Sequence, residues 1–257
     1  MKIKKILVSQ PEPQSEKSPY YEIAEKNNVK IDFRPFIHVE PIETKDFRKQ
    51  RINILDHSGV IFTSKTAIDH FFRVANEMRI SVPDSMKYFC TSESIAHYLQ
   101  KYIVYRKRKI FFGKGGFADL VEVLEKHKTE NFLVPLSEQH KIEIPELLTK
   151  WNLKFTIAVL YRTVSSDLSD LMKLNYDVLV FFSPSGIRSL LKNFPEFEQK
   201  DTIIASFGNS TARAVKEAGL RLDLEAPLPN APSMTMALDL FIKEFNKNGK
   251  AKQIEKV

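Results

Sequence analysis

The sequence predicts an α/β protein built on buried parallel strands. Short apolar runs alternate along the chain with stretches of helical periodicity, which is typical of strands that feed directly into helices. Glycine and serine residues mark helix ends: Gly219 follows one helical stretch, and Ser233 precedes another. The expected strands are 6–8, 60–62, 132–134, 178–182 and 203–205. The expected helices are 66–75, 94–102, 117–127, 185–194, 211–218 and 233–245.

Composition excludes several classes of protein. The chain has 257 residues, more than one typical domain, and its 43% hydrophobic and 28% charged residues are ordinary for a globular protein. Its longest apolar run, 178–182, is too short to span a membrane, and the apolar stretch near the start ends at Ser9, which favours a first strand over a signal peptide. The single Cys90 cannot form an internal disulfide, so we expect a cytoplasmic protein.

The net charge of +7 favours an anionic partner. The densest basic stretch, 105–109, lacks any DNA-binding or RNA-binding signature, so we interpret it as a solvated turn and expect neither nucleic acid nor a membrane as a partner. The six histidines show no metal-binding spacing, so we expect no metal. The segment 113–116 lacks the spacing of a phosphate-binding loop and is interpreted as an ordinary loop.

An internal repeat predicts two similar α/β domains. Residues 61–68 match 180–187, residues 90–96 match 206–212, and the segment from 7 to 33 resembles that from 133 to 157. The residues alone leave open whether the domains lie in tandem or whether the first segment joins the second half. The extended stretches 33–40 and 157–163 could pair and cross between domains.

Hydroxyl residues follow several of the expected strands, at 63–64, 183–185 and 210–211. In open α/β sheets ligands bind at the carboxyl ends of strands, where free N–H groups of helix N-termini hold anions. Helix capping alone explains any one such position. Their recurrence predicts an anion site with several contact points. Neither Ser64 nor Ser183 lies in a nucleophile elbow, so we expect catalysis to depend on positioning and electrostatics.

These motifs, taken in order, resemble the uroporphyrinogen-III synthase family over nearly the whole chain. They are Ile-Phe-Thr-Ser at 61–64, Val-Pro at 134–135 with Pro145, Leu-Tyr-Arg-Thr at 160–163, Phe-Phe-Ser-Pro-Ser-Gly at 181–186 and Gly-Asn-Ser-Thr-Ala-Arg-Ala at 208–214. The resemblance implies two flavodoxin-like domains with parallel sheets, joined by a two-stranded antiparallel ladder, with a ligand cleft between the domains. Domain 1 would be 1–37 plus 164–257 and domain 2 would be 38–163, with ladder strands near 33–40 and 157–163.

The resemblance also implies the reaction. Members of the family are hydro-lyases that cyclise the linear tetrapyrrole hydroxymethylbilane to uroporphyrinogen III in haem biosynthesis, with inversion of ring D and loss of water. We therefore expect a small-molecule polycarboxylate substrate, no cofactor and a monomer. A basic protein with hydroxyls and helix N-termini at its strand ends suits such a substrate.

Individual residues match the family's functional positions. Tyr161 matches the tyrosine proposed to assist departure of the substrate hydroxyl, and a phenol can donate at neutral pH. Lys65 and Lys141 could supply cations, and Ser94 could replace the hydroxyl that this sequence lacks at the adjacent position 95. The substrate-binding residues implied are Thr63, Ser64, Lys65, Ser94, Lys141, Ser183, Ser185, Gly186, Gly208, Ser210 and Thr211.

Two segments depart from the family pattern: 92–95, and 135–141, where bacterial members often have arginine-glycine and Lys141 could supply the cation. Where the later half has Gly-Asn-Ser-Thr at 208–211, the earlier half has Ser-Glu-Ser-Ile at 92–95, which loses the glycine and the threonine and adds a negative charge. This departure supports an alternative, a non-catalytic tetrapyrrole-carboxylate binding or regulatory protein of the same fold.

Overall fold

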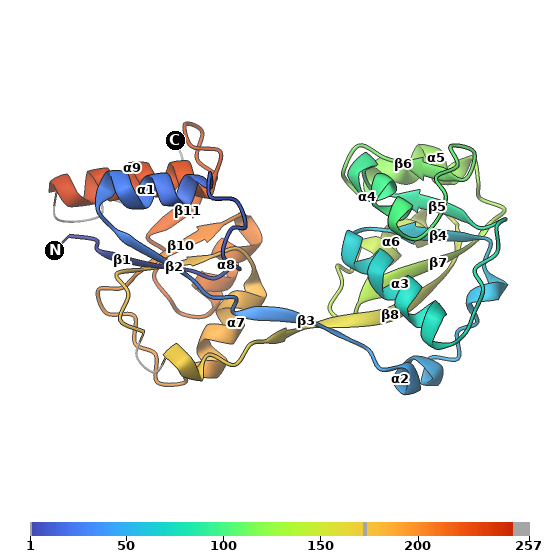
Figure 1. Ribbon diagram of the computed structural model, residues 1–257, viewed down its shortest axis with the longest axis horizontal. Helices are drawn as coiled ribbons and strands as arrows, with labels where there is room; N and C mark the ends of the chain where they lie inside the picture. The colour runs from blue at the N-terminus through green and yellow to red at the C-terminus, as the bar shows by residue number, and fades with distance from the viewer. Residues whose placement is uncertain (1, 172–173, 249–257) are drawn as a thin grey trace. The chain divides into compact units, whose positions relative to one another are not determined.

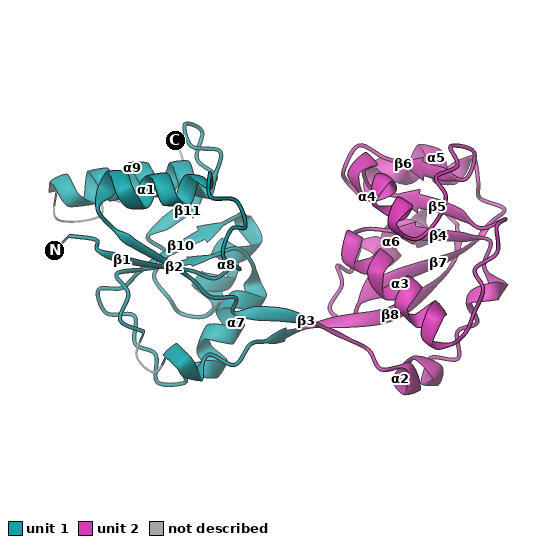
Figure 2. Ribbon diagram, viewed as in Figure 1, with its two compact units in different colours: residues 1–38, 164–257 teal, residues 39–163 magenta. Residues whose placement is uncertain are grey.

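The computed structural model describes residues 2–171 and 174–248. Its chain divides into two compact units: unit 1 contains Met1–His38 and Val164–Val257, and unit 2 contains Val39–Thr163 (Figure 2). Each unit holds one β-sheet covered by helices (Figure 1). The domain boundaries themselves, 1–37 plus 164–257 and 38–163, stay a prediction.

The sheet of unit 1 has the strand order β11-β10-β9-β1-β2, and all its paired strands are parallel. Numbered along the chain within the unit, this is the 2-1-3-4-5 order of flavodoxin-like sheets. The strands are β1 (Lys5–Val8), β2 (Lys30–Phe33), β9 (Val178–Phe181), β10 (Ile203–Phe207) and β11 (Leu224–Ala226).

Alternating side chains explain the layers of unit 1. Ile6 and Val8 pack into the core cluster that contains residues of α1 and α9, whereas Leu7 packs into the cluster that contains residues of α7 and α8. Both faces of the sheet are therefore buried, which is why its strands appear in the sequence as continuous apolar runs. The helices are α1 (Pro19–Asn27), α7 (Pro184–Asn193), α8 (Asn209–Glu217) and α9 (Met234–Asn248), with a 3-10 turn η4 (Ser169–Leu171).

The sheet of unit 2 has the order β3-β8-β7-β4-β5-β6. The repeated segments occupy equivalent places in the two sheets, since β7, β4 and β5 follow one another as β1, β9 and β10 do. β8 continues past the boundary into unit 1, and β3 lies beside it at the sheet edge. The strands are β3 (Ile37–Pro41), β4 (Gly59–Phe62), β5 (Lys87–Cys90), β6 (Ile110–Phe112), β7 (Asn131–Ser137) and β8 (Lys154–Ser165).

Two of the expected helices are wrong in extent. The helix expected at 117–127 is a 3-10 turn followed by a five-residue helix, and the one expected at 94–102 ends in a 3-10 turn. Both stretches have short helical segments, and tertiary packing rather than local periodicity fixes such short pieces. The helices and turns of unit 2 are α2 (Thr44–Lys49), η1 (Ile54–Asp56), α3 (Lys65–Glu77), α4 (Glu93–Tyr98), η2 (Leu99–Lys101), η3 (Ala118–Leu120), α5 (Val121–Glu125) and α6 (Glu143–Lys150).

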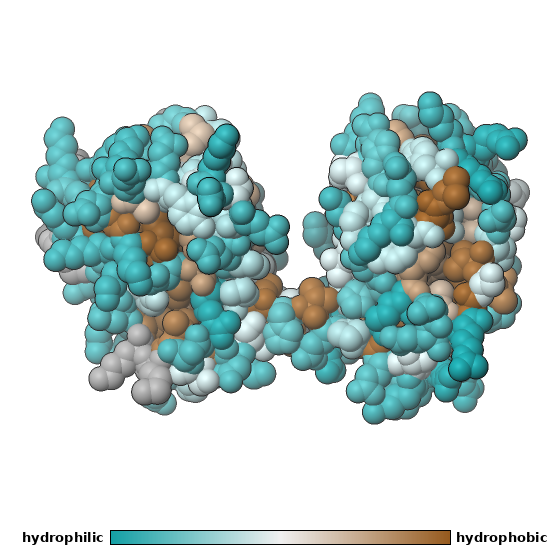
Figure 3. Space-filling model, in the orientation of Figure 1, coloured by the Kyte–Doolittle hydropathy of each residue, from teal (hydrophilic) through white to brown (hydrophobic). Residues whose placement is uncertain are grey.

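The visible surface of each unit is mainly hydrophilic, with hydrophobic side chains showing in separate places (Figure 3). Cys90 is fully buried in β5, and burial raises the pKa of its thiol to about 12, so it is a core residue as expected. Among the residues that the structure describes, none of the helices has the length and apolar character needed to cross a bilayer.

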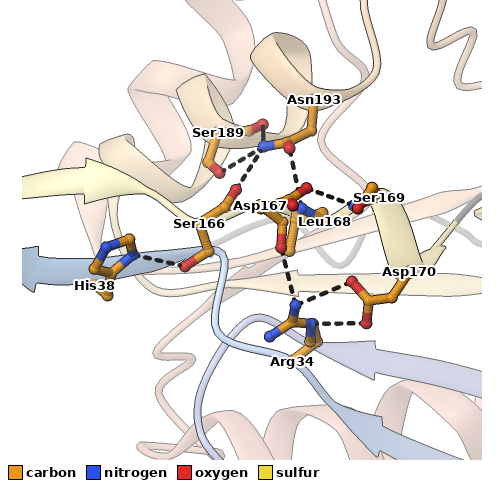
Figure 4. A network of polar contacts seen from close by, with 9 residues as sticks. All are labelled: Arg34, His38, Ser166, Asp167, Leu168, Ser169, Asp170, Ser189 and Asn193. Atoms are coloured by element: carbon orange, nitrogen blue, oxygen red, sulfur yellow. Dashed lines mark hydrogen bonds and ion pairs between the residues drawn. The ribbon is translucent and has the colours of Figure 1, made fainter.

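A polar network in unit 1 holds the segment that follows β8 (Figure 4). Asn193 Oδ1 accepts from the backbone N–H of Leu168 at 3.1 Å, and its Nδ2 donates to the backbone oxygens of Ser166 at 3.0 Å and Ser189 at 2.9 Å. Arg34 donates to both carboxylate oxygens of Asp170 at 3.0 Å. These bonds fasten the returning chain to α7 and to the end of β2.

Replacing Asn193→Ala should lower the free energy of unfolding by about 2 kcal/mol, because it leaves the buried Leu168 N–H without a partner. Chemical denaturation followed by circular dichroism would measure this loss. The control Asn230→Ala, at an exposed turn residue, should change stability by less than about 0.5 kcal/mol. Equal effects of the two substitutions would contradict the importance of the network.

Candidate active site

Hydroxyl side chains in unit 2 lie where its parallel strands end. Thr63 and Ser64 follow β4, and Thr91 follows β5. Ser64 caps the N-terminus of α3, because its Oγ accepts a hydrogen bond from the backbone N–H of Ala67 at 3.1 Å. Capping therefore accounts for part of the role of Ser64, but the hydroxyl keeps its own proton to donate.

A β-bulge aims Tyr161 toward Ser64. Leu136 pairs with Val159 but the next residue of β7, Ser137, pairs with Tyr161, so β8 carries one additional residue at this point. Leu160 and Tyr161 consequently both join the core cluster that contains the residues of α3. Strict alternation would turn two successive side chains to opposite faces of the sheet. Bulges redirect side chains in this way and are common near active sites.

Side chains from two neighbouring segments fix the backbone of the bulge. The amide of Gln50 donates to the carbonyl of Val159 at 2.8 Å and accepts from its N–H at 3.0 Å. The carbonyl of Leu160 accepts from the N–H of Ile42 at 3.0 Å and from Arg73 Nη2 at 3.3 Å. Both backbone groups of Val159 and the carbonyl of Leu160 are therefore satisfied, which stabilises the register shift.

The Tyr161 side chain is only 8% exposed. Its ring stacks on that of His70, with centroids 5.1 Å apart and planes 16° apart, and its hydroxyl lies 3.4 Å from Ser64 Oγ. Burial raises the pKa of Tyr161 above its usual value of 10.0, and the hydrogen bond with Ser64 only partly opposes this. The phenol is therefore protonated at neutral pH and can donate a hydrogen bond.

The His70 ring beneath Tyr161 is neutral at pH 7. Burial lowers its pKa below the usual 6.5, and the positive charge of Arg73 lowers it further. Arg73 Nε lies 3.2 Å from His70 Nδ1, and because the guanidinium can only donate, Nδ1 must be the acceptor. The proton of the imidazole is therefore on Nε2, as assigned from this hydrogen bond.

Tyr161 lines a pocket of about 490 Å³ in unit 2, a volume in the range of small-molecule sites. Of the predicted substrate-binding residues, Thr63 and Lys141 also line it. Its other lining residues are Thr91, Gly115, Gly116, Phe117, Ala118, Leu136, Ser137, Gln139, His140, Glu143 and Ile144. Within residues 2–171 and 174–248, no group of three or more histidine, cysteine or acidic residues is arranged to hold a metal ion.

Three predicted residues of unit 2, Ser64, Lys65 and Ser94, do not line this pocket. Lys65 is exposed at the start of α3, and its Nζ lies 5.4 Å from the centroid of the Tyr98 ring. Ser94 is exposed in α4, and its hydroxyl lies 3.1 Å from that of Ser92. Glu93, which brings the unexpected negative charge, lies 3.5 Å from His97 one turn further along α4.

In unit 1 the predicted residues around α7 are close together. Ser183 caps this helix by accepting a hydrogen bond from the N–H of Gly186 at 3.2 Å, and Ser185 Oγ accepts from Arg188 at 2.7 Å. A Cβ added at Gly186 would lie 3.2 Å from the ring of Phe181 and 3.8 Å from the hydroxyl of Ser9. The absence of a side chain at Gly186 thus allows the helix to approach the ends of β9 and β1 closely.

The predicted residues around α8 differ in exposure. Gly208 precedes the helix with a φ of +86°, a conformation that favours glycine, and its N–H donates to the carbonyl of Ala226 at 2.7 Å. Ser210 is exposed, whereas Thr211 is only 1% exposed. The hydroxyls of Thr211 and Ser206 are buried without a hydrogen-bond partner among the described residues.

Comparison with known proteins decides the family. A family model described as uroporphyrinogen-III synthase HemD matches residues 18–236, which is most of the chain. The chain belongs to the uroporphyrinogen-III synthase family. This family consists of enzymes that act on small-molecule tetrapyrroles in tetrapyrrole biosynthesis.

Individual relatives agree with the family assignment. A uroporphyrinogen-III synthase of Chlorobaculum parvum is 21% identical, and the match covers 92% of this chain and 98% of that protein. The crystal structure of the Helicobacter pylori uroporphyrinogen-III synthetase aligns with a TM-score of 0.60 at 18% identity, over 94% of this chain and 100% of the other. A mutant uroporphyrinogen III synthase of Thermus thermophilus aligns with a TM-score of 0.55 at 13% identity, over 95% and 100%. At these identities the structures show a shared mixed α/β fold.

Sequence reasoning missed several pocket residues of this uroporphyrinogen-III synthase family member. Thr91 follows β5 as Thr63 follows β4, so the internal repeat contained the signal for it. Gly115 donates to the carbonyl of Thr91 at 2.8 Å, which brings the loop at 113–116 against the end of β5. Ser137 lines the pocket with a buried hydroxyl that has no partner among the described residues. Its place opposite Tyr161 depends on the bulge and has no sequence signal.

Ser64→Ala should lower the stability of unit 2 by about 1 kcal/mol, because α3 loses its cap. Urea unfolding followed by the fluorescence of Trp151, the only tryptophan of the chain, reports on this unit. Ser85→Ala, at an exposed turn position of the same unit, is the matched control and should leave the unfolding midpoint nearly unchanged. An unchanged midpoint for Ser64→Ala as well would remove the capping role.

Proposed function

We propose that this family member is a uroporphyrinogen-III synthase that cyclises hydroxymethylbilane to uroporphyrinogen III, with inversion of ring D and loss of water, in haem biosynthesis. It would therefore be a hydro-lyase. The observation that carries the proposal is the Tyr161 phenol, which lines a pocket of about 490 Å³ together with Thr63, Ser137 and Lys141. Membership of the family supplies the chemical class of the substrate.

In the proposed reaction Tyr161 donates a hydrogen bond to the hydroxyl that leaves. The C–O bond breaks, the hydroxyl departs with a proton as water, and an electron-deficient carbon remains on the pyrrole next to it. The substituted carbon of ring D attacks that carbon and forms a spiro intermediate, in which it is bonded to two methylene bridges. Its bond to the bridge from ring C then breaks, and that bridge bonds to the free α-carbon of ring D, which loses one proton, so the ring ends inverted. One molecule of water is released in total, and the step needs neither an oxidant nor a reductant.

The main task of the protein in this reaction is to control the conformation in which the linear tetrapyrrole closes. Spontaneous closure gives the isomer in which ring D is not inverted, so selectivity is a matter of positioning. We propose that Lys141 and Thr63 hold carboxylate arms of the substrate near Tyr161. We propose a similar contact role for the remaining predicted residues, with N–H groups at the starts of α7 and α8 as further anion donors. These residues are Ser64, Lys65, Ser94, Ser183, Ser185, Gly186, Gly208, Ser210 and Thr211.

The alternative function is binding of a tetrapyrrole carboxylate without turnover. Glu93, exposed at the start of α4, favours it, because a carboxylate at this position repels an anionic arm. Such a protein would bind the tetrapyrrole but would not change the ratio of the isomers. An isomer assay therefore separates the two functions.

Purified protein given hydroxymethylbilane should form predominantly the type III isomer, measured by chromatographic separation of the oxidised porphyrins. Tyr161→Phe should slow closure on the order of 10²-fold, because it removes the proposed donor but keeps the ring that stacks on His70. The control Tyr105→Phe removes a hydroxyl of the same unit outside the pocket and should keep the wild-type rate.

This assay tests the proposed function and the role of Tyr161 separately. If the wild-type protein yields only the spontaneous type I isomer, the proposed function is wrong. If Tyr161→Phe closes the ring at the wild-type rate with type III selectivity, the function holds and the role of Tyr161 is wrong.

A further inference from the structure

Unit 2 contains a second pocket, of about 420 Å³, that shares no lining residue with the Tyr161 pocket. It lies at the starts of the strands, since Tyr88 and Ile110, which pair at the beginnings of β5 and β6, both line it. The Tyr161 pocket is instead lined by residues that follow β4 and β5. The second pocket is therefore at the end of the sheet where the parallel strands begin, and the Tyr161 pocket is at the end where they finish.

Most of the side chains that line this pocket are apolar, and they include the aromatic rings of Phe72 and Tyr102. Phe72 and Tyr102 stack with centroids 4.5 Å apart and planes 7° apart. The hydroxyls of Tyr102 and Tyr98 both donate to Asp69, which fixes the position of the Tyr102 ring. The aliphatic lining residues are Ala75, Ile80, Val82, Met86, Ile103, Val104 and Ile110.

One polar group of the interior has no partner. Tyr88 is 4% exposed, and its hydroxyl forms no hydrogen bond within the described part of the chain. Burial, together with the negative charge of Asp84, raises the pKa of Tyr88 to about 12. The group is therefore a protonated phenol that can donate to an acceptor on a bound molecule.

Basic side chains exceed acidic ones among the residues that line the pocket. Arg106 Nη1 lies 3.3 Å from the Asp84 carboxylate, and the two side chains are 46% and 89% exposed, so water screens this ion pair strongly. Lys109 donates instead to the backbone carbonyl of Asp84 and leaves the carboxylate to Arg106. The pocket lining thus contains two cations, Arg106 and Lys109, and one carboxylate, Asp84. Both cations belong to the basic stretch 105–109, which the proposed reaction does not use.

We propose that this pocket binds a small organic anion with a flat aromatic body, as a free molecule. The Phe72–Tyr102 pair would contact the aromatic body, Tyr88 would donate to a polar atom on it, and Arg106 with Lys109 would hold the anionic group. The combination of an apolar cavity with a few convergent polar groups is typical of small-molecule sites. The proposal does not depend on the reaction proposed for the Tyr161 pocket.

The test uses 1-anilinonaphthalene-8-sulfonate, an aromatic sulfonate whose fluorescence rises in apolar surroundings. The wild-type protein should bind one equivalent saturably. Arg106→Gln should raise the Kd about fivefold and Tyr88→Phe about threefold. Lys107→Gln, which removes the same charge from the adjacent residue outside the pocket, should leave the Kd within about twofold.

Two results would overturn the proposal. They are the absence of saturable binding and equal changes of Kd for Arg106→Gln and Lys107→Gln. Tyr88→Phe keeps the aromatic ring in the core, so it tests the pocket even if Arg106→Gln disturbs the turn before β6.

Discussion

The register shift between β7 and β8 is the constraint on which the candidate site depends. Side chains alternate along a strand, so a shift of one residue decides which face of the sheet Tyr161 occupies. With the shift, Tyr161 lies against His70 and Ser64 on α3 and lines the pocket. Gln50 and Arg73 stabilise the shifted backbone through hydrogen bonds to Val159 and Leu160. The position of the phenol is thus set by backbone bonds from outside the pocket.

The second determinant is the parallel arrangement of both sheets. Parallel neighbours end at the same edge, so the helices that follow them present their N-termini there. In each unit a serine caps the helix after the central strand, Ser64 after β4 and Ser183 after β9. Helix N-termini at these edges favour anions, and Lys141 lines the pocket at the edge of unit 2. This agrees with a family whose substrates are tetrapyrroles.

The strands were predictable because parallel strands are buried on both faces and form continuous apolar runs. The strand-end hydroxyls were predictable as well, since Thr63 and Ser64 follow such a run directly. The bulge was not, because register is set by hydrogen bonds between distant segments such as Gln50 and Val159. The loop at 113–116 was judged only by its lack of a phosphate-binding motif, and its contact with Thr91 depends on tertiary structure. Lys65 was predicted from its place in a motif, but its ammonium group lies over the ring of Tyr98.

A crystal structure of the protein with bound uroporphyrin III would show whether Tyr161 and Lys141 contact a tetrapyrrole. We expect the tetrapyrrole against the pocket of unit 2, with a polar atom about 3 Å from the Tyr161 hydroxyl and a carboxylate near Lys141. The bulge between Leu136 and Ser137 should be unchanged in that complex. A tetrapyrrole bound elsewhere, with no contact to Tyr161, would refute the role assigned to this pocket.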